Sequence, residues 1–175
     1  MKKFASIFII AIVLMVSNVV SADKLFPDHL NGDLNFVICD GHMDCGYYII
    51  KDSIAVISED YPEYIISVDI AAVPNASYQC GANIDIYKTE TETFLYNVEE
   101  LNMFYVNKDG EWEYLDPWGA WYKTGITMPA GELSYYYVYG EKFYGNYEST
   151  YKPTGGYLEI SYKKYNDEFY RPLYE

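Results

Sequence analysis

The stretch CDGHMDC, residues 39–45, holds the densest set of reactive side chains in the sequence. It places two thiols around one imidazole and two carboxylates, so three kinds of chemistry have to be weighed. A zinc site needs about four ligands, of which Cys39, His42 and Cys45 could supply three, with a neighbouring aspartate or Cys80 as the fourth. The spacing matches no standard zinc motif, and it is not the C-x-x-C arrangement of redox catalysts.

A disulfide is the third possibility, and the sequence favours it because thiols of exported proteins tend to oxidise. Three cysteines allow one bridge and leave one thiol over. Cys80 could pair with Cys39 or with Cys45. Cys39 could also pair with Cys45, provided that their Cα atoms come within roughly 4.4–6.8 Å of each other. We therefore predict a covalently restrained hairpin loop at residues 39–45, with no metal bound and the pairing left open.

The N-terminal segment carries the evidence for export. Met1 is followed by two lysines, by an apolar run from Phe4 to Val20, and by the small residues Ser21 and Ala22. This pattern predicts a secretory signal peptide over residues 1–22 and a mature chain of residues 23–175. An uncleaved anchor helix is the alternative, although the run is slightly short for a bilayer span of roughly 20 residues.

Net charge limits the classes of partner. Loss of Lys2 and Lys3 with the signal peptide would change the net charge from −14 to −16. Such a surface repels nucleic acid and anionic membrane, so we expect neither as a partner after cleavage. It suits solubility and cationic partners or divalent ions, and with the signal peptide it predicts a protein that is secreted, periplasmic or displayed at the cell surface. The mature length fits one domain with a core of its own.

The elements that must position these residues are mainly strands. Tyrosine occurs 22 times and favours pleated, half-buried surfaces. Strands are expected at residues 35–39, 46–50, 54–58, 64–73, 83–96, 101–106, 111–115 and 157–162. Asp52-Ser53 is expected to form a turn, and Asp109-Gly110 between two strand-like runs predicts a hairpin.

One helix is expected in the C-terminal half, over residues 129–144, with Thr127 as its N-cap. Leu133, Tyr136, Gly140 and Phe143 share one helical face and are expected to face the sheet. The polar tail, residues 163–175, is expected to be loosely held. The sequence thus predicts an α+β fold, an antiparallel β-sheet with one C-terminal-half helix packed on it.

A second group of candidate residues lies in EWEYLDPWGAWY, residues 111–122. Trp118, Trp121 and Tyr122, with Glu113 beside them, are candidate ligand-binding residues, because exposed rings next to carboxylates can stack on a sugar or on an aromatic-rich ligand. The alternative is that Trp112 and one other tryptophan belong to the core, since aromatic residues in sheets usually pack.

Signals for catalysis are sparse. The sequence has no G-x-S-x-G elbow, no H-E-x-x-H and no P-loop. A glycosidase would need two carboxylates facing one cleft, which a sequence cannot show. We therefore expect a non-enzymatic protein without a cofactor.

The stretch CGYYIIKDSIAVISEDYPEYIISVDIAAV, residues 45–73, resembles the start of bacterial surface-adhesin protein E-like domains. Tyr48, the run Asp52-Ser53-Ile54 and the strand Tyr64–Ile70 carry the resemblance. NKDGEWEYLDP and TGITMPAGEL are similar to secreted bacterial proteins of unknown function. The resemblance implies an antiparallel sheet with a helix, surface exposure and binding to host extracellular proteins.

From the resemblance we expect an adhesin-like binding protein that contacts extracellular protein ligands. A carbohydrate or cell-wall binding module, using exposed Trp and Tyr beside carboxylates, is the alternative.

Overall fold

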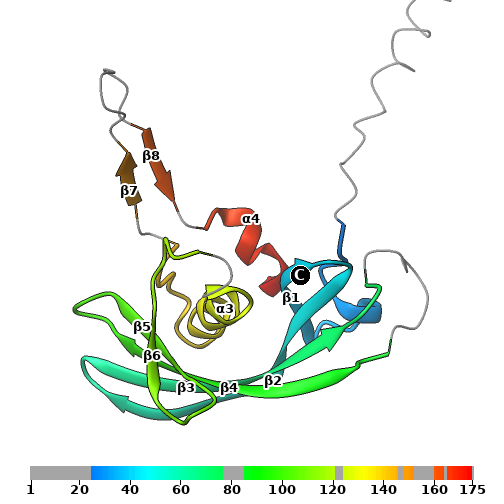
Figure 1. Cartoon of the computed structure of the whole chain (residues 1–175), viewed down its shortest axis with the longest axis horizontal. Helices are drawn as coiled ribbons and strands as arrows, with labels where there is room; N and C mark the ends of the chain where they lie inside the picture. Colours follow the sequence, from blue (N-terminus) through cyan, green and yellow to red (C-terminus); the bar gives the residue numbers. More distant parts are fainter. Residues whose placement is uncertain are drawn as a thin grey trace, which may run out of the picture.

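The computed structural model describes residues 25–76, 85–120, 124–145, 148–151, 160–163 and 165–174. Six antiparallel strands form one curled sheet, and their order in the sheet is their order in the chain (Figure 1). The elements are η1 Leu30–Gly32, β1 Phe36–His42, β2 Cys45–Asp60, β3 Glu63–Val73, β4 Lys88–Asn97, β5 Asn102–Val106, β6 Trp112–Leu115, α3 Thr127–Tyr139, β7 Glu148–Tyr151, β8 Ile160–Lys163, α4 Asp167–Tyr170 and η2 Arg171–Leu173. The predicted α+β class is confirmed. The predicted signal peptide lies outside the described residues.

The helix α3 lies inside the curve of the sheet, so the sheet has a concave face towards the helix and a convex face away from it (Figure 1). Strand alternation sorts the side chains of β3 between these faces. Ile66, Val68 and Ile70 are buried on the concave face and belong to the main core with α3. Of the residues of opposite parity, Ile65, Ser67 and Asp69 are half-buried, whereas Ala71 and Val73 near the end of the strand are buried.

A second, smaller core covers part of the convex face. Leu30, Tyr48, Val73 and Ala76 are buried there, with Phe26, Phe36 and Ile38 packed against them. The N-terminal lead-in and η1 therefore cover the convex face near β1, β2 and the end of β3.

The predicted turn at Asp52-Ser53 is wrong, because β2 runs through it. The β2–β3 register shifts between Ile50 and Ala55, so the segment is an irregularity inside a continuous strand. The Ser53 hydroxyl donates to the carbonyl of Ile50 at 2.7 Å and accepts from the N–H of Asp69 at 2.8 Å. One side chain thus replaces the missing ladder contacts, which keeps the strand in the sheet.

The Asp109-Gly110 hairpin is confirmed. Gly110 has a φ of +80°, and its N–H donates to the carbonyl of Asn107 at 3.0 Å. The final strand, predicted at residues 157–162, corresponds to β8, Ile160–Lys163. It pairs with β7 in a separate two-stranded sheet and not with the main sheet.

Thr127 is the first residue of the helix and not its N-cap, which is Ile126, and the helix ends five residues before the predicted end. Gly140 adopts a left-handed conformation with a φ of +69°, and its N–H caps the carbonyl of Tyr136. Phe143 is buried as expected, but it lies beyond the helix, as does the buried Tyr144. Gly131 permits close packing on the sheet, since an added Cβ would lie 2.6 Å from the Met103 sulfur.

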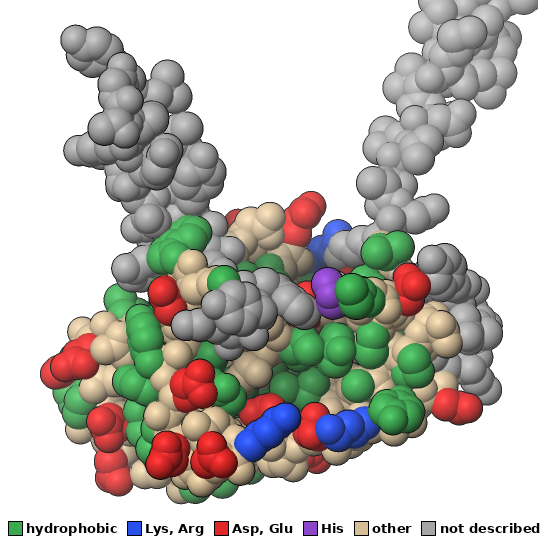
Figure 2. Space-filling view, in the orientation of Figure 1, with side chains coloured by type: hydrophobic (Ala, Val, Ile, Leu, Met, Phe, Trp, Pro, Cys, Tyr) green, Lys and Arg blue, Asp and Glu red, His purple; other side chains and the backbone are tan. Residues whose placement is uncertain are grey.

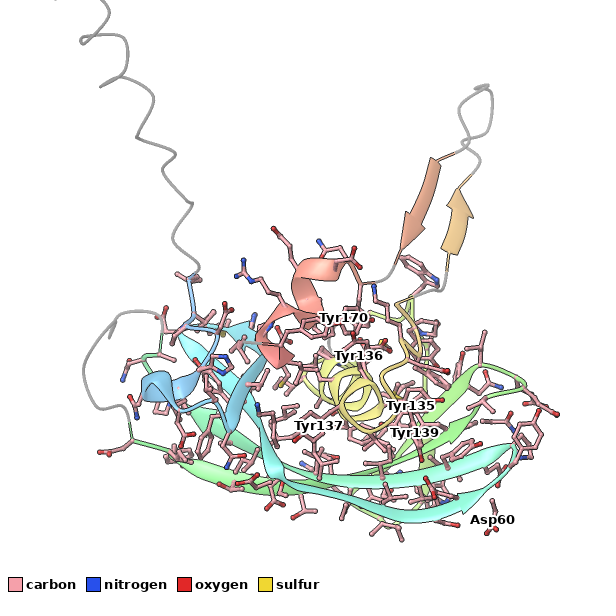
Figure 3. The ribbon with its side chains drawn as sticks, turned by 180° about the vertical axis from the view of Figure 1, so that it is seen from behind. Asp60, Tyr135, Tyr136, Tyr137, Tyr139 and Tyr170 are labelled. Carbon is pink, nitrogen blue, oxygen red and sulfur yellow. The ribbon has the colours of Figure 1, made fainter. Side chains whose placement is uncertain are left out.

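The helical face was predicted only in part. Leu133 is buried in the main core as expected. Tyr136, however, packs on Tyr170 of α4, with ring centroids 4.6 Å apart, whereas Tyr135 faces the sheet and contacts Tyr96 at 4.9 Å (Figure 3). The three consecutive tyrosines are therefore divided between the sheet, α4 and solvent.

The prediction of a loose tail is wrong. The Asn166 side chain caps α4 by accepting from the N–H of Phe169 at 3.1 Å. Tyr170 has no exposed surface. The end of the chain packs on the rest of the molecule, with α4 against α3 through Tyr170 and Tyr136, and η2 against β1.

Candidate functional site

The predicted binding cluster of residues 111–122 is split between the two faces of the sheet. In β6, Glu113 points to the concave side, whereas Trp112 and Tyr114 on either side of it point to the convex side. Trp118 lies in the turn after β6, where its N–H donates to the Asp116 carboxylate, and 43% of its surface is exposed. Trp121 and Tyr122 lie outside the described residues.

The convex side carries an apolar surface that we call the aromatic face. Its members are Ile65, Leu95, Phe104, Val106, Trp112 and Tyr114. The register places Ile65, Leu95, Phe104 and Tyr114 opposite one another, so they form one row across four strands. The Phe104 and Tyr114 rings lie 5.5 Å apart, which is a normal contact distance for aromatic pairs.

No described element covers the aromatic face. Trp112 is 44% exposed and Tyr114 is 47% exposed, and the other four members are half-buried. None of the six belongs to either core cluster of the described residues, although the Tyr114 side chain reaches the core residue Tyr144. The helix α3 lies on the other side of the sheet, so the expectation that Trp112 is a core residue is wrong (Figure 1).

The β5–β6 hairpin that presents two of these rings is fixed at both ends. At the turn, the N–H of Asn107 donates to the carbonyl of Glu111 at 2.8 Å. At the other end, the Tyr144 hydroxyl donates to the carbonyl of Leu115 at 3.0 Å and accepts from the N–H of Met103 at 2.9 Å. The aromatic face is therefore held by a well-anchored strand pair.

The concave side beyond the start of α3 is open and acidic. The register places Glu90 beside Ile70 and Glu92 beside Val68, so both carboxylates point inward. A hollow of about 400 Å³ is lined in part by Glu92, Tyr105 and Glu113. Figure 2 shows that acidic side chains outnumber basic ones on the side in view.

Burial and hydrogen bonding change the acidity of groups in this hollow. Burial, together with the nearby charge of Glu90, raises the pKa of Glu92. Burial also raises the pKa of Tyr105, helped by the Glu113 carboxylate, which accepts from the Tyr105 hydroxyl at 3.2 Å. Glu113, the predicted ligand-binding carboxylate, thus already has a partner within the protein.

The CDGHMDC stretch forms a hairpin, as predicted, but not one closed by Cys39–Cys45. The register pairs Cys45 with His42, and Cys39 lies three residues further along β1, roughly 10 Å at about 3.3 Å per residue. That exceeds the Cα separation of a disulfide, so these two thiols are not bonded to each other. Cys80 lies outside the described residues, so its pairing stays a prediction.

The two thiols differ in their surroundings. Cys39 sits at a bulge in β1, is buried, and donates to the carbonyl of Tyr47 at 3.1 Å. Burial, and secondarily the charge of Asp40, raises the pKa of the Cys39 thiol well above its ordinary value. Cys45 is half-buried. The burial of the neighbouring Tyr47, together with its hydrogen bond to the Cys45 side chain, raises the pKa of Tyr47 to about 12.

Among the described residues, no three Cys, His, Asp or Glu side chains come together to hold a metal ion.

The most constrained charged residue was not among the sequence candidates. Glu132 of α3 is fully buried, and its carboxylate accepts from the N–H groups of Tyr144 and Gly145 at 2.7 and 3.1 Å and from the Tyr170 hydroxyl at 2.6 Å. It joins α3, the segment after it and α4. A glutamate flanked by Gly131 and Leu133 gave only a weak sequence signal, because its partners lie far along the chain.

The part of the chain that the structure describes contains no helix long and apolar enough to cross a membrane. The resemblance to surface-adhesin protein E-like domains remains an expectation. Comparison of the chain with protein-family models, curated proteins and solved structures gave no match.

Proposed function

We propose that the protein is a non-enzymatic, adhesin-like binding protein of the periplasm, cell surface or extracellular space, which holds an extracellular protein ligand on its aromatic face. The exposure of Trp112 and Tyr114 on an uncovered sheet face carries this proposal. Contiguous exposed apolar surface often marks a binding site. Tryptophan and tyrosine are also enriched among the residues that dominate interface energies.

The sheet gives this surface a fixed shape. Its members come from four neighbouring strands in register, and the β5–β6 pair is anchored by Tyr144. A surface on rigid elements loses little conformational entropy when a ligand binds, so more of the contact energy appears as affinity. Replacing a central interface aromatic residue by alanine typically costs about 2–4 kcal/mol of binding energy.

The experiment is a binding screen against immobilised extracellular-matrix proteins and glycans. Wild type is compared with the double variant Trp112→Ala/Tyr114→Ala and with Tyr137→Ala. Tyr137 is a matched control, because it is 46% exposed but lies on α3. We expect binding to a matrix protein that falls at least tenfold in the double variant and is unchanged in the control.

Absence of binding to every matrix protein would reject the proposal. Equal binding by wild type and the double variant would reject the aromatic face as the surface. Far-ultraviolet circular dichroism of both variants would establish that the comparison is between folded proteins.

A carbohydrate or cell-wall binding module is the second candidate, favoured by the exposure of both described tryptophans, Trp112 and Trp118. Exposed indole rings beside carboxylates can stack on sugar rings. The same screen distinguishes this candidate: binding to glycans alone, with loss in Trp118→Ala, would replace the protein-binding proposal.

A further inference from the structure

We infer that the partner of the aromatic face is a basic protein segment, whose apolar side chains pack on the rings while its lysines or arginines pair with the carboxylates at the β2–β3 end of the face. This inference rests on the proposed function and adds the chemistry of the partner. It comes from the distribution of charge around the face.

The first end of the face lies at the β2–β3 and β4–β5 turns. Its carboxylates are Asp60, Glu63, Glu99 and Glu100, all of them exposed. The register pairs Asp60 with Glu63, and Glu63 lies two residues before Ile65 on the same side of β3. The partners of Asp60 and Glu99 include the neutral hydroxyls of Ser58 and Tyr61, which leave their negative charge in place.

The second end lies at the β5–β6 turn, next to Trp112. Asp109 and Glu111 are exposed there. Asp109 and Lys108, however, line the concave hollow, and Glu111 has the same parity in the hairpin as Glu113, so the register places no carboxylate of this turn on the convex side. The face is therefore apolar in its centre and negative at its first end. A partner with the complementary pattern, an apolar stretch with a basic end, fits it best.

The two contributions have different roles. An exposed ion pair is worth only about 0–1 kcal/mol, so the carboxylates alone would bind weakly. Several like charges around a surface nevertheless speed the association of a cationic partner and disfavour an anionic one. The rings supply affinity and the carboxylates supply selectivity. Removal of the rings should therefore weaken binding of every peptide, whereas removal of the carboxylates should weaken binding of cationic peptides only.

The geometry sets the size of the partner. From the row of Glu63 to the row of Trp112 is four residues along the strands, roughly 13 Å at about 3.3 Å per residue. An extended peptide of about ten residues is therefore more than long enough to cover the face and reach its acidic end in either direction.

The experiment uses three fluorescein-labelled peptides of about ten residues, titrated into the purified protein and followed by anisotropy. The first has lysines at both ends and an apolar centre. The second has glutamates at the ends and the same centre, and the third has lysines at the ends and a serine centre. We expect the first peptide to bind at least tenfold more tightly than either of the others.

Variants then locate the binding. Tyr114→Ala should weaken binding of the first peptide about tenfold, and Asp60→Asn/Glu63→Gln should weaken it several-fold and flatten its salt dependence. Glu113→Gln is the matched control, because Glu113 is an exposed carboxylate of β6 that points to the concave side. It should leave the affinity unchanged.

The other outcomes separate this inference from the proposed function. Equal binding of the lysine-ended and glutamate-ended apolar peptides, weakened by Tyr114→Ala, would retain the aromatic face and reject the basic partner. Equal binding of both lysine-ended peptides, unaffected by Tyr114→Ala, would reject both claims. Absence of saturable binding by the first peptide would reject the basic partner.

Discussion

At the scale of single residues, the buried Glu132 carboxylate has the clearest structural role. It accepts three hydrogen bonds and is itself fully buried, so its removal would leave three buried donors without an acceptor. Breaking a buried charged network in this way is strongly destabilising, whereas loss of one hydroxyl is modest.

We therefore expect Glu132→Ala to lower the free energy of unfolding by about 3–5 kcal/mol, and Tyr170→Phe by about 1–2 kcal/mol. Urea unfolding followed by tryptophan fluorescence measures both. Equal, small losses in the two variants would show that the carboxylate does not hold the three segments together.

Burial also gives Glu132 a pH signature. Burial raises the pKa of Glu132 above its ordinary value of 4.5, although the Tyr170 hydroxyl and the N–H groups of Tyr144 and Gly145 oppose the shift. The native chain thus binds this proton more tightly than the unfolded chain. Its contribution to stability is complete below the unfolded pKa and is lost as the pH rises through the native pKa.

Because Glu132→Gln cannot ionise, it should lack this loss. We expect the stability of wild type relative to Glu132→Gln to decrease as the pH rises from about 4 to 7, measured by urea unfolding at each pH. An increase over that range would mean that the native pKa is lowered instead.

The two described thiols should react at different rates. In the reduced, folded protein we expect iodoacetamide to alkylate Cys45 and to spare Cys39, because Cys39 is buried and its pKa is raised. Peptide mass spectrometry measures the two sites separately, and reaction after unfolding is the control. Equal labelling in the folded state would contradict the burial of Cys39.

At the scale of elements, the contact between α3 and the sheet depends on Gly131. A Cβ there would lie 2.6 Å from the Met103 sulfur and 2.9 Å from the Phe94 ring. Gly131→Ala should therefore destabilise by about 1–3 kcal/mol, even though alanine favours helix by about 1 kcal/mol.

Gly140→Ala is the contrasting variant, because nothing lies within 4 Å of an added Cβ but the φ is +69°. It should cost about 1 kcal/mol through backbone strain alone. Thermal unfolding of both variants tests the two mechanisms. A stabilised Gly131→Ala would show that α3 can move away from the sheet without cost.

Local sequence signals explain which elements could be predicted. Alternation located β3, and Asp109-Gly110 located the β5–β6 turn, because both depend on neighbouring residues. The continuity of β2 depends on Ser53 bonding across to Asp69, and the order of the tail depends on Tyr170 reaching Glu132. Neither long-range contact leaves a local pattern.

The candidate site was predicted in composition but not in geometry. The composition of the segment around β6 indicated its aromatic and acidic character. The sequence alone, however, predicted Glu113 and its aromatic neighbours as one cluster. Strand alternation places Glu113 on the concave side and Trp112 and Tyr114 on the convex side. The row formed with Ile65 and Phe104 depends on register across four strands, which the sequence alone does not specify.

At the scale of the whole molecule, the curled sheet separates two kinds of surface. The concave face is filled by α3 at one end and open and acidic at the other. The convex face is covered near β1 by the N-terminal lead-in and bare over the aromatic face. A net charge of −14 favours basic partners for any exposed surface.

Export is the expectation on which an extracellular role depends. We expect the exported protein to begin near Asp23, because the apolar segment ends at Val20 and the next two residues are small. N-terminal sequencing or intact mass of protein recovered from outside the cytoplasm measures this. Recovery of the whole chain from the cytoplasm alone would contradict it.

The central claim is that the aromatic face is the binding surface, and hydroxyl-radical footprinting with and without the lysine-ended apolar peptide tests it most directly. Trp112 and Tyr114 can be compared with Trp118 and Tyr137, since all four side chains are similarly exposed. We predict that the peptide lowers the oxidation rates of Trp112 and Tyr114 and leaves those of Trp118 and Tyr137 unchanged. Protection of Trp118, with Trp112 and Tyr114 unaffected, would contradict the account.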